Sequence, residues 1–425
     1  MAPTHPSLSR RDFLQLSSAV GAASLLPATL PAAHVAGRDT LRVGLIGCGG
    51  RGRGAVRDMI NAQPGIEITA LADLFDDRIQ EALSELGKLG AAFKVDRAHC
   101  FTGFDAHLKL LQSGVDAVIL ATPPGFRPMQ LRAAIDAGKH VFTEKPVAVD
   151  APGVRSVLAT AALADQKKLC VVAGTQRRHQ AGYLEALKRV HDGAIGELVA
   201  GRCFWNQGSL WMKPRQPQWS DMEWQLRNWL YFTWLSGDHI CEQHVHNLDV
   251  MNWALRGVPV RATALAGREV RKDPAYGNVF DHFAVDYEYP GGVHIISMCR
   301  QIDGCANEVA EHVVGTKGRG WFSSDSWEIR AGQVWRQTNE GQRNPYVQEQ
   351  DDLVTAIRSG RHINELRTVA EATMTAILGR MSAYTGRALT WDQALKSEQD
   401  LMPRKLELGP IDVPPIAVPG QTPFV

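Results

Sequence analysis

From residue 41 to about residue 150, short and mostly apolar runs alternate with amphipathic stretches. A continuous apolar run is typical of a strand buried on both faces, and a 3.6-residue period is typical of a helix packed on a sheet. The predicted strands are 41–46, 66–71, 100–102, 115–124 and 140–146, and the predicted helices are 76–89, 104–113, 128–137 and 151–166. This alternation predicts an α/β fold with a doubly wound parallel sheet.

The pattern changes further along the chain. The stretch 169–180 is a predicted strand. From residue 196 apolar and polar residues alternate along the chain, as in half-buried antiparallel strands. The segment 280–300 is a predicted hairpin that turns at Pro290, Gly291 and Gly292. We therefore expect α/β plus α+β architecture: a doubly wound α/β domain over 37–168, an open, mostly antiparallel sheet domain with C-terminal helices (347–359 and 366–386) over 169–402, and an extended tail over 403–425.

The first predicted strand runs into a glycine-rich loop, GCGGRG, that opens a helix. Its glycines match G-x-G-x-x-G: Gly47 permits a tight turn, Gly49 lets the backbone approach a pyrophosphate, and Gly52 allows close packing of helix on strand. The pyrophosphate is expected at the helix N-terminus, next to Gly50 and Arg51. The same pattern also occurs in strand-helix turns that bind nothing, so the context decides.

That context includes an acidic residue after the second strand. Asp73 lies about 20 residues beyond the loop, where a carboxylate can accept hydrogen bonds from an adenosine ribose. It can equally cap the helix that follows. An acid here repels a 2′-phosphate, which favours NAD over NADP, whereas Arg51, Arg53 and Arg78 favour the reverse.

Further candidate cofactor residues lie where parallel strands end, because ligands bind at the carboxyl ends of such strands. They are Thr122, Pro123, Glu144, Lys145 and, in the next segment, Gln176. A lysine under a nicotinamide can orient a substrate hydroxyl and tune its proton transfer. The alternative is a surface lysine before a turn proline, and the position of Lys145 after the glycine loop favours the catalytic role.

The segment 242–255 is predicted to be helical, which places Glu242 and His246 on one face. A histidine beside a carboxylate can act as general base on an alcohol, with Glu242 holding its orientation. Lys145, His246 and Glu242 are therefore the candidate catalytic residues. Metal ligation by His239, Glu242, His244 and His246 is the weaker alternative, because the spacing is not H-E-x-x-H, and no metal is expected.

Seven of the eleven tryptophans lie between residues 205 and 253. Indole faces stack on sugar C–H groups, so this segment can form a lid that faces a carbohydrate, although core packing also accounts for such residues. The candidate substrate residues are Arg177, Arg178, Trp205, Asn206, Trp234 and Asp249.

These motifs together resemble the glucose-fructose oxidoreductase, inositol dehydrogenase and rhizopine-catabolism family, written Gfo/Idh/MocA. The resemblance rests on GLIGCGGRG, Asp73, ATPP, TEKP, GTQRRH and HNLDVMNW. It implies a catalytic lysine at Lys145, a cis bond before Pro146, a catalytic histidine at His246 and an acidic partner at Asp249. Two departures are Glu242, where the family commonly has aspartate, and PPGFRP in place of an Asn-x-x-His stretch.

The resemblance also implies a Rossmann domain followed by an open sheet for substrate binding and oligomerisation, with a C-terminal helix returning to the first domain. We therefore expect a homo-oligomer, dimeric or tetrameric. Composition agrees with a soluble two-domain enzyme: 425 residues, 44% apolar and a net charge of +1 give no argument for nucleic acid or a stable membrane anchor. The seven cysteines lack C-x-x-C spacing and are expected to be mostly buried free thiols.

Residues 1–36 have the pattern of a twin-arginine signal peptide, with Arg10 and Arg11 before a short apolar run. The alternative is a basic helix of a cytosolic protein. Export of the folded protein to the periplasm or beyond allows a nucleotide to be loaded first. Because no nicotinamide pool exists there, the cofactor must be held tightly and restored within each cycle.

The leading hypothesis is an exported NAD(P)-dependent oxidoreductase that acts on a hydroxyl of a sugar, sugar derivative or cyclitol, with a tightly held cofactor. The cofactor is expected to be NAD, with NADP as the alternative. A redox-cycling NAD-dependent glycosidase or lyase is the second hypothesis, and a non-catalytic sugar-binding protein is the third.

Overall fold

A six-stranded parallel sheet, sheet A, forms the first part of the structure, a computed structural model that describes residues 40–425. Its strand order is β3-β2-β1-β4-β5-β6, the order of a Rossmann fold. The strands are β1 (Leu41–Ile46), β2 (Ile66–Asp73), β3 (Cys100–Thr102), β4 (Ala117–Leu120), β5 (His140–Thr143) and β6 (Val171–Ala173). The connecting helices are α2 (Gly50–Ala62), α3 (Asp76–Leu86), α4 (Ala106–Leu111), α5 (Arg127–Asp136) and α6 (Ala151–Lys167).

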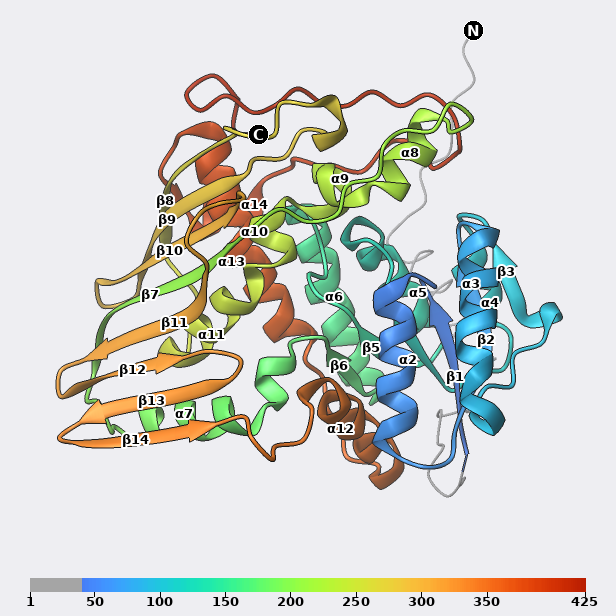
Figure 1. The fold of residues 1–425 in the computed structure, drawn as a ribbon, viewed down its shortest axis with the longest axis horizontal. Coiled ribbons are helices and arrows are strands. Elements are labelled where there is room, and N and C mark those ends of the chain that lie inside the picture. The colour runs from blue at the N-terminus through green and yellow to red at the C-terminus, as the bar shows by residue number, and fades with distance from the viewer. Residues whose placement is uncertain (1–39) are drawn as a thin grey trace, which may run out of the picture. The chain divides into compact units, whose positions relative to one another are not determined.

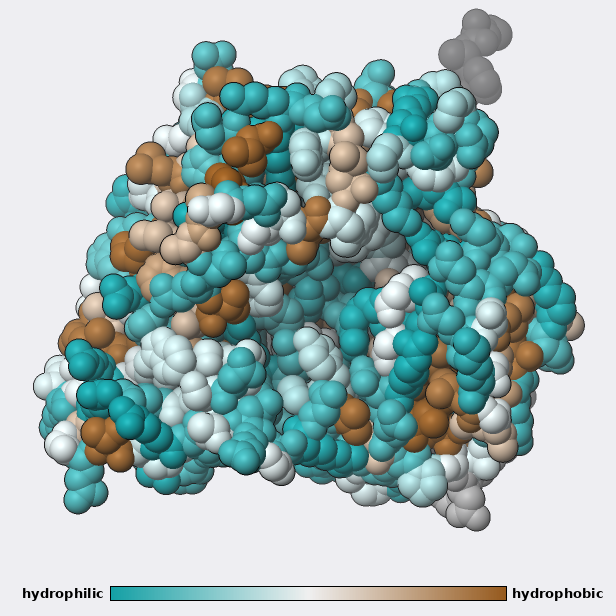
Figure 2. All heavy atoms as spheres, viewed as in Figure 1, coloured by the Kyte–Doolittle hydropathy of each residue, from teal (hydrophilic) through white to brown (hydrophobic). Residues whose placement is uncertain are grey.

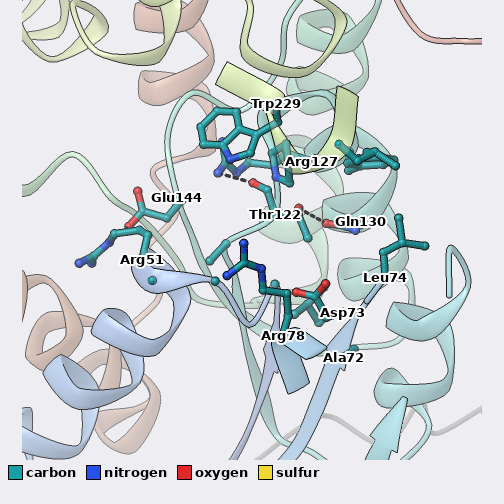
Figure 3. Close-up of a pocket in the computed structure, with 18 of the residues that line it drawn as sticks. Arg51, Ala72, Asp73, Leu74, Arg78, Thr122, Arg127, Gln130, Glu144 and Trp229 are labelled. Atoms are coloured by element: carbon teal, nitrogen blue, oxygen red, sulfur yellow. Dashed lines mark hydrogen bonds and ion pairs between the residues drawn. The ribbon is translucent and has the colours of Figure 1, made fainter. Parts of the chain in front are cut away.

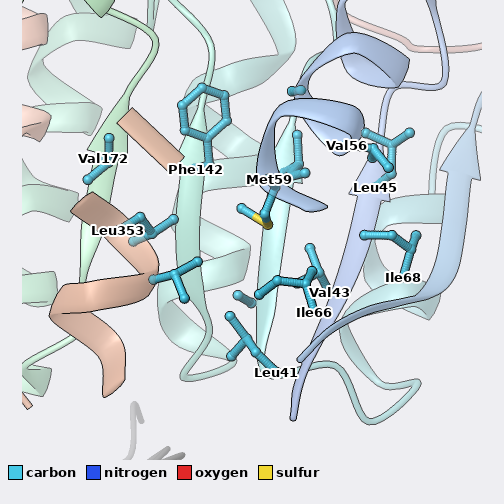
Figure 4. Packing of buried hydrophobic residues seen from close by; sticks show 14 of the residues in the cluster. Leu41, Val43, Leu45, Val56, Met59, Ile66, Ile68, Phe142, Val172 and Leu353 are labelled. Atoms are coloured by element: carbon cyan, nitrogen blue, oxygen red, sulfur yellow. The ribbon is translucent and has the colours of Figure 1, made fainter. Parts of the chain in front are cut away.

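The strands of sheet A are buried among these helices, which explains their apolar sequences. Leu41, Val43 and Leu45 of β1 are fully buried and pack with Met59 of α2 in one apolar cluster (Figure 4). The predicted parallel sheet is confirmed. The predicted strand 169–180 is wrong over most of its length: β6 spans three residues and belongs to sheet A, and Gln176–His179 form a short 3-10 helix.

A nine-stranded sheet, sheet B, forms the second part, in the order β14-β13-β12-β11-β7-β10-β9-β8-β15. The strands are β7 (Leu198–Gln207), β8 (Arg261–Gly267), β9 (His282–Tyr289), β10 (Val293–Gln301), β11 (Glu308–Gly315), β12 (Gly318–Phe322), β13 (Ser326–Ala331), β14 (Gln333–Thr338) and β15 (Leu389–Thr390). All pairs are antiparallel except β7 with β10. The expected mostly antiparallel sheet and its β9–β10 hairpin are thus confirmed (Figure 1).

The helices of the second part are α7 (Ala181–His191), α8 (Asp221–Arg227), α9 (Thr233–Ser236), α10 (His239–Glu242), α11 (Val245–Leu255), α12 (Pro345–Ser359), α13 (Leu366–Thr385) and α14 (Trp391–Lys396). Helices α7, α11 and α13 pack on sheet B, and the other helices of this part lie beside it or against the first part of the fold. Leu353 and Val354 of α12 pack into the core of sheet A, so a C-terminal helix does return to the first part of the chain. The tail from Pro403 contains neither helix nor strand, as expected.

The predicted signal peptide, 1–36, lies outside the described residues. Within residues 40–425 no helix combines the length and apolar character needed to cross a bilayer. All seven cysteines are free thiols, five of them buried, which confirms the expectation for them.

Candidate active site

A cavity of about 640 Å³ lies at the carboxyl ends of the strands of sheet A. Its walls come from the glycine loop, from the ends of β2, β4 and β5, and from the segment between β7 and α11. Figure 2 shows the molecular surface hollowed between the two parts of the fold. Ten of the eleven candidate cofactor residues line this cavity, namely Gly47, Gly49, Gly50, Arg51, Asp73, Thr122, Pro123, Glu144, Lys145 and Gln176.

The glycine loop shows why its glycines are needed. Gly47 has a φ of 96°, and a Cβ on it would lie 2.6 Å from the Thr122 backbone nitrogen. Gly52, the eleventh candidate, packs beneath the loop, where a Cβ would lie 2.0 Å from the Gly47 oxygen. A Cβ on Gly49 would meet nothing within 4 Å. The loop therefore leaves open space in front of the N-terminus of α2, which fits a pyrophosphate.

Asp73 is held by the backbone at the end of β2. Its Oδ2 accepts a hydrogen bond from the Cys48 amide at 2.7 Å, and its Oδ1 accepts one from the Phe75 amide at 3.0 Å. Burial raises the pKa of Asp73 above its ordinary value. Figure 3 shows the side chain of Arg78 beside this carboxylate, so the adenosine end of the cavity carries both charges.

Arg51 of α2 is surrounded by carboxylates. Its Nε donates to Glu144, its Nη1 donates to Asp58 at 3.4 Å, and its guanidinium lies 4.9 Å from the ring centre of Tyr346. Burial opposes ionisation of Glu144, but Arg51 and Lys145 hold the pKa of that carboxyl below its ordinary value. The pair is visible in Figure 3. It fixes the far end of the loop that holds the pyrophosphate.

Lys145 follows β5 and points across the cavity to α10. Its Nζ donates to the Glu242 backbone oxygen at 2.6 Å and to Glu242 Oε1 at 3.2 Å. The Lys145–Pro146 peptide bond is cis, as the family resemblance implies. An ammonium has three N–H donors, so two contacts leave one for a ligand.

His246 lies near this pair but is not bonded to Glu242, which corrects two expectations. The helical hydrogen-bond pattern is interrupted between α10 and α11, where the His244 amide donates to the His239 oxygen and the His246 amide donates to the Gln243 oxygen. Glu242 and His246 therefore do not share one continuous helix. Glu242 pairs with Lys145 instead of orienting the imidazole. His246 lines the cavity and stacks on Trp205, with ring centres 5.6 Å apart. Burial and Lys145 lower the pKa of His246 well below its ordinary value.

Three candidate substrate residues are engaged in buried polar contacts outside the cavity. Arg177 pairs with Glu311, which also accepts from Tyr183 at 2.7 Å. Arg178 donates to both carboxylate oxygens of Asp249, at 2.8 and 3.0 Å. These arginines and Asp249 therefore support α11 and sheet B rather than facing a ligand, because tertiary pairing satisfies them.

The tryptophans divide between packing and the cavity. Trp234 is 2% exposed and donates to Gln225 at 2.8 Å, so it is a core residue and does not line the cavity. Trp205 supports His246, and Asn206 pairs along β7 with Arg300 and Glu308. Trp211 and Trp229 belong to the tryptophan-rich segment but are not among the candidate substrate residues, and both line the cavity.

Several residues of the cavity wall were missed. Arg127 is buried, donates to the Thr122 backbone oxygen at 2.7 Å, and has a pKa lowered to about 10 by burial. Thr122 donates to Gln130 at 2.6 Å (Figure 3). These contacts occupy the PPGFRP segment, where the resemblance offers no guide. Phe75, Lys213 and Arg227 also line the wall, and no motif marks them.

Among the described residues, no group of three or more His, Cys, Asp and Glu is placed to hold a metal ion. The side chains of the alternative metal set diverge. His244 Nε2 lies 2.6 Å from Ser297 Oγ, whereas Glu242 faces Lys145.

Comparisons with known proteins agree with this geometry. Residues 41–175 match the model of the oxidoreductase family with an NAD-binding Rossmann fold, and residues 183–320 match the Gfo/Idh/MocA C-terminal domain. Residues 7–27 match the twin-arginine translocation signal, so the N-terminus carries an export signal.

The chain is similar to an inositol 2-dehydrogenase/D-chiro-inositol 3-dehydrogenase of Shouchella clausii, at 27% identity over 51% of this chain and 53% of the relative. It is 30% identical to inositol 2-dehydrogenase 3 of Saccharopolyspora erythraea over 55% of this chain and 59% of that protein. The matched region thus spans about half the length of these curated relatives.

Solved structures share the fold. An aldose-aldose oxidoreductase of Caulobacter crescentus, complexed with glycerol, superposes with a TM-score of 0.65 at 19% identity, over 83% of this chain and 99% of that one. A scyllo-inositol dehydrogenase of Lactobacillus casei, with bound NAD(H) and scyllo-inositol, gives 0.63 at 18% identity over the same shares. With both family models matched along the chain, the protein belongs to the Gfo/Idh/MocA family of oxidoreductases, whose first domain binds NAD.

Proposed function

We propose that the protein oxidises or reduces a hydroxyl-bearing carbon of a sugar, sugar derivative or cyclitol with a tightly held nicotinamide cofactor. The observation that carries the proposal is the meeting of Lys145, Glu242 and His246 in the cavity that the glycine loop opens onto. The names of the relatives, which are inositol dehydrogenases and an aldose-aldose oxidoreductase, support the substrate class.

The residues of the cavity fit a dinucleotide. Open space at Gly49 and the N-terminus of α2 suit the pyrophosphate, and Asp73 lies where the adenosine ribose is expected. NAD, when bound, supplies the hydride acceptor or donor at its nicotinamide. Glu144 and Lys145 directly follow β5, and Lys145 donates from there to Glu242 of α10.

Side chains of the protein bind the substrate hydroxyl and accept its proton. Two N–H groups of Lys145 donate to Glu242. The third can donate to the substrate oxygen and so fix the position of the substrate. His246 lines the cavity beside Lys145, and an unprotonated imidazole nitrogen placed there can accept the hydroxyl proton as general base. Glu242 is a positioning residue, because it acts by holding Lys145.

Trp211 and Trp229 offer indole faces to a polyhydroxylated ligand. Their rings contact each other edge to face, with centres 6.1 Å apart, so the two indoles hold one another in place. We assign to them the sugar contacts that the sequence analysis expected of Trp234.

Export through the twin-arginine pathway supports a periplasmic enzyme whose cofactor is restored within each cycle. The uncovered face of sheet B, with Ile296, Met298 and Leu265 exposed by 39, 40 and 81%, supports a homo-oligomer formed through that face. Light scattering of the purified protein tests the oligomer, and a monomer at working concentration contradicts it.

The function is tested on protein purified from the exported fraction. Mass spectrometry of the small molecules released on denaturation is expected to find stoichiometric NAD(H), or NADP(H) as the alternative. Sugars and cyclitols are then added to the intact protein, and the absorbance of the reduced nicotinamide is followed. A protein that neither contains nor binds a dinucleotide would overturn the proposal. Glycosidic cleavage without net reduction would assign the redox-cycling chemistry instead.

A further inference from the structure

The segment 208–231 connects β7 of sheet B to α9 and crosses the adenosine side of the cavity. We call it the strap; it contains α8, which lies at the top of Figure 1. Lys213, Leu226 and Arg227 of the strap line the cavity. The opposite wall at this place is Phe75 and Arg78, at the start of α3. A loop of the second part of the fold therefore forms one wall of the predicted adenosine site.

An ion pair joins the strap to the first part of the fold. Arg227 donates from Nη1 to Asp77 Oδ2 at 2.8 Å and from Nη2 to Asp77 Oδ1 at 3.3 Å. The guanidinium lies 3.9 Å from the ring centre of Phe75, and its Nε donates to Glu223 at 2.9 Å. The pair is bidentate and stacked, which is the geometry that gives arginine contacts their specificity.

Apolar packing closes the same edge. Met222, Trp224 and Leu226 of α8 belong to one apolar cluster with Leu74, Phe75 and Phe104 from the side of sheet A. The C-terminal tail supports the strap from outside, since the Met222 amide donates to the Gly409 oxygen at 3.0 Å. Opening the strap therefore exposes apolar surface as well as breaking the ion pair, and both changes cost free energy.

Lys213 is the cation of this region that lacks a protein partner. Its backbone is fixed, because its amide donates to Asn228 Oδ1 at 2.9 Å and its oxygen accepts from Trp224 Nε1 at 3.3 Å. The neighbouring arginines are engaged, Arg227 with Asp77 and Arg78 with Glu81. Among residues 40–425 no carboxylate pairs with the Lys213 ammonium, which lines the cavity. Burial, Arg78 and Arg227 lower the pKa of Lys213.

We propose that the strap retains the dinucleotide, by closing over its adenosine half and by placing Lys213, with Arg78, against a phosphate of that half. The inference rests on the proposed function, because it needs a dinucleotide in the cavity. The phosphate is either the pyrophosphate, common to NAD and NADP, or the 2′-phosphate of NADP. Release then requires the Arg227–Asp77 contact to break, which explains how an exported protein keeps its cofactor.

The first experiment measures release. Protein loaded with NADH is diluted into excess NAD, and the loss of bound-nucleotide fluorescence gives the rate. Arg227→Gln and Asp77→Asn each remove one side of the contact, and each is expected to speed release about tenfold. The double variant should release no faster than the single ones. Asp77→Asn changes an exposed side chain of α3, so it reports on the contact even where Arg227→Gln disturbs the strap.

The matched control is Arg336→Gln, which removes an exposed ion pair with Glu328 at the edge strand of sheet B. Its release rate should equal that of the unmodified protein. Unchanged release in both Arg227→Gln and Asp77→Asn would overturn the strap as a retention device. A parent protein that binds no dinucleotide would overturn the proposed function instead, so the two failures are distinguishable.

The second experiment measures affinity by calorimetry with NAD and with NADP. Lys213→Gln should weaken binding about tenfold, whereas Lys188→Gln, at an exposed ion pair on α7, should leave it unchanged. Equal loss for both nucleotides assigns Lys213 to the pyrophosphate, and loss confined to NADP assigns it to the 2′-phosphate. Unchanged affinity for both would overturn the role of Lys213.

Discussion

Each end of the cavity is built from residues of both parts of the fold. At each end an ion pair joins the two parts, and the two ion pairs differ in how far they are buried. At the nicotinamide end, the Lys145–Glu242 pair is largely buried, with side chains 12 and 15% exposed. At the adenosine end, Arg227 is 12% exposed but its partner Asp77 is 53% exposed. The first contact is embedded in the core, and the second can open to water.

This difference separates chemistry from cofactor exchange. Groups that transfer a proton need fixed geometry, which burial and packing provide. A site that must load its cofactor once needs a contact that can open, which a half-exposed ion pair on a loop provides. The following changes test whether the two ends are independent.

The largest effect is expected from Lys145→Met. It removes the ammonium that we propose to hold the substrate oxygen, so turnover should fall about 10³-fold. The dinucleotide content, measured by mass spectrometry, should remain stoichiometric, because the adenosine end is intact. Lys188→Gln is the control lysine variant. Loss of the nucleotide together with turnover would show that the two ends are coupled.

A smaller loss is expected from Glu242→Gln, which keeps the shape but removes the charge that holds Lys145. Turnover should fall about tenfold with little change in KM, because a positioning residue acts on the reacting geometry. Glu242→Asp should recover part of the rate. A rise in KM of about tenfold, with unchanged turnover, would instead place Glu242 in substrate binding.

The nicotinamide end is also the part that the sequence predicted best. Its residues come from short motifs at the ends of strands, and the order of a doubly wound sheet brings those ends together. The sequence did not predict which groups pair. Glu242 and His246 stand four positions apart, but the helical hydrogen-bond pattern is interrupted between them, and Glu242 faces Lys145, 97 positions away.

The adenosine end could not be predicted for a related reason. The strap has little regular structure, and its contacts join residues about 150 positions apart, such as Arg227 and Asp77. Periodicity reports on burial within an element and not on which distant element covers it. The tryptophan-rich composition marked the segment, yet only the packing shows that Trp234 is core and Trp229 lines the cavity.

Acid should destabilise the folded protein through three buried histidines. Burial lowers the pKa of His239 and His246 well below 6.5 and that of His244 to about 3. Because unfolding lets each ring take up a proton, the free energy of unfolding should fall as the pH drops below 6.5, by about 1.4 kcal/mol per pH unit per histidine. Urea unfolding across this range measures the slope. His244→Gln should reduce the slope by one histidine's share, and an unchanged slope would contradict the assignment.

The smallest effect is expected from salt, and it acts on the adenosine end. Asp77 is half exposed, so raising the ionic strength should screen its attraction to Arg227 and speed dinucleotide release about two- to threefold. Turnover of retained cofactor should not change, because the Lys145–Glu242 pair is shielded from solvent. In Asp77→Asn the ion pair is absent, so the salt dependence of release should shrink to the part that comes from the phosphate contacts of Lys213 and Arg78. If salt instead changed turnover and release in parallel, strap opening would limit catalysis itself, and the cavity would work as one unit.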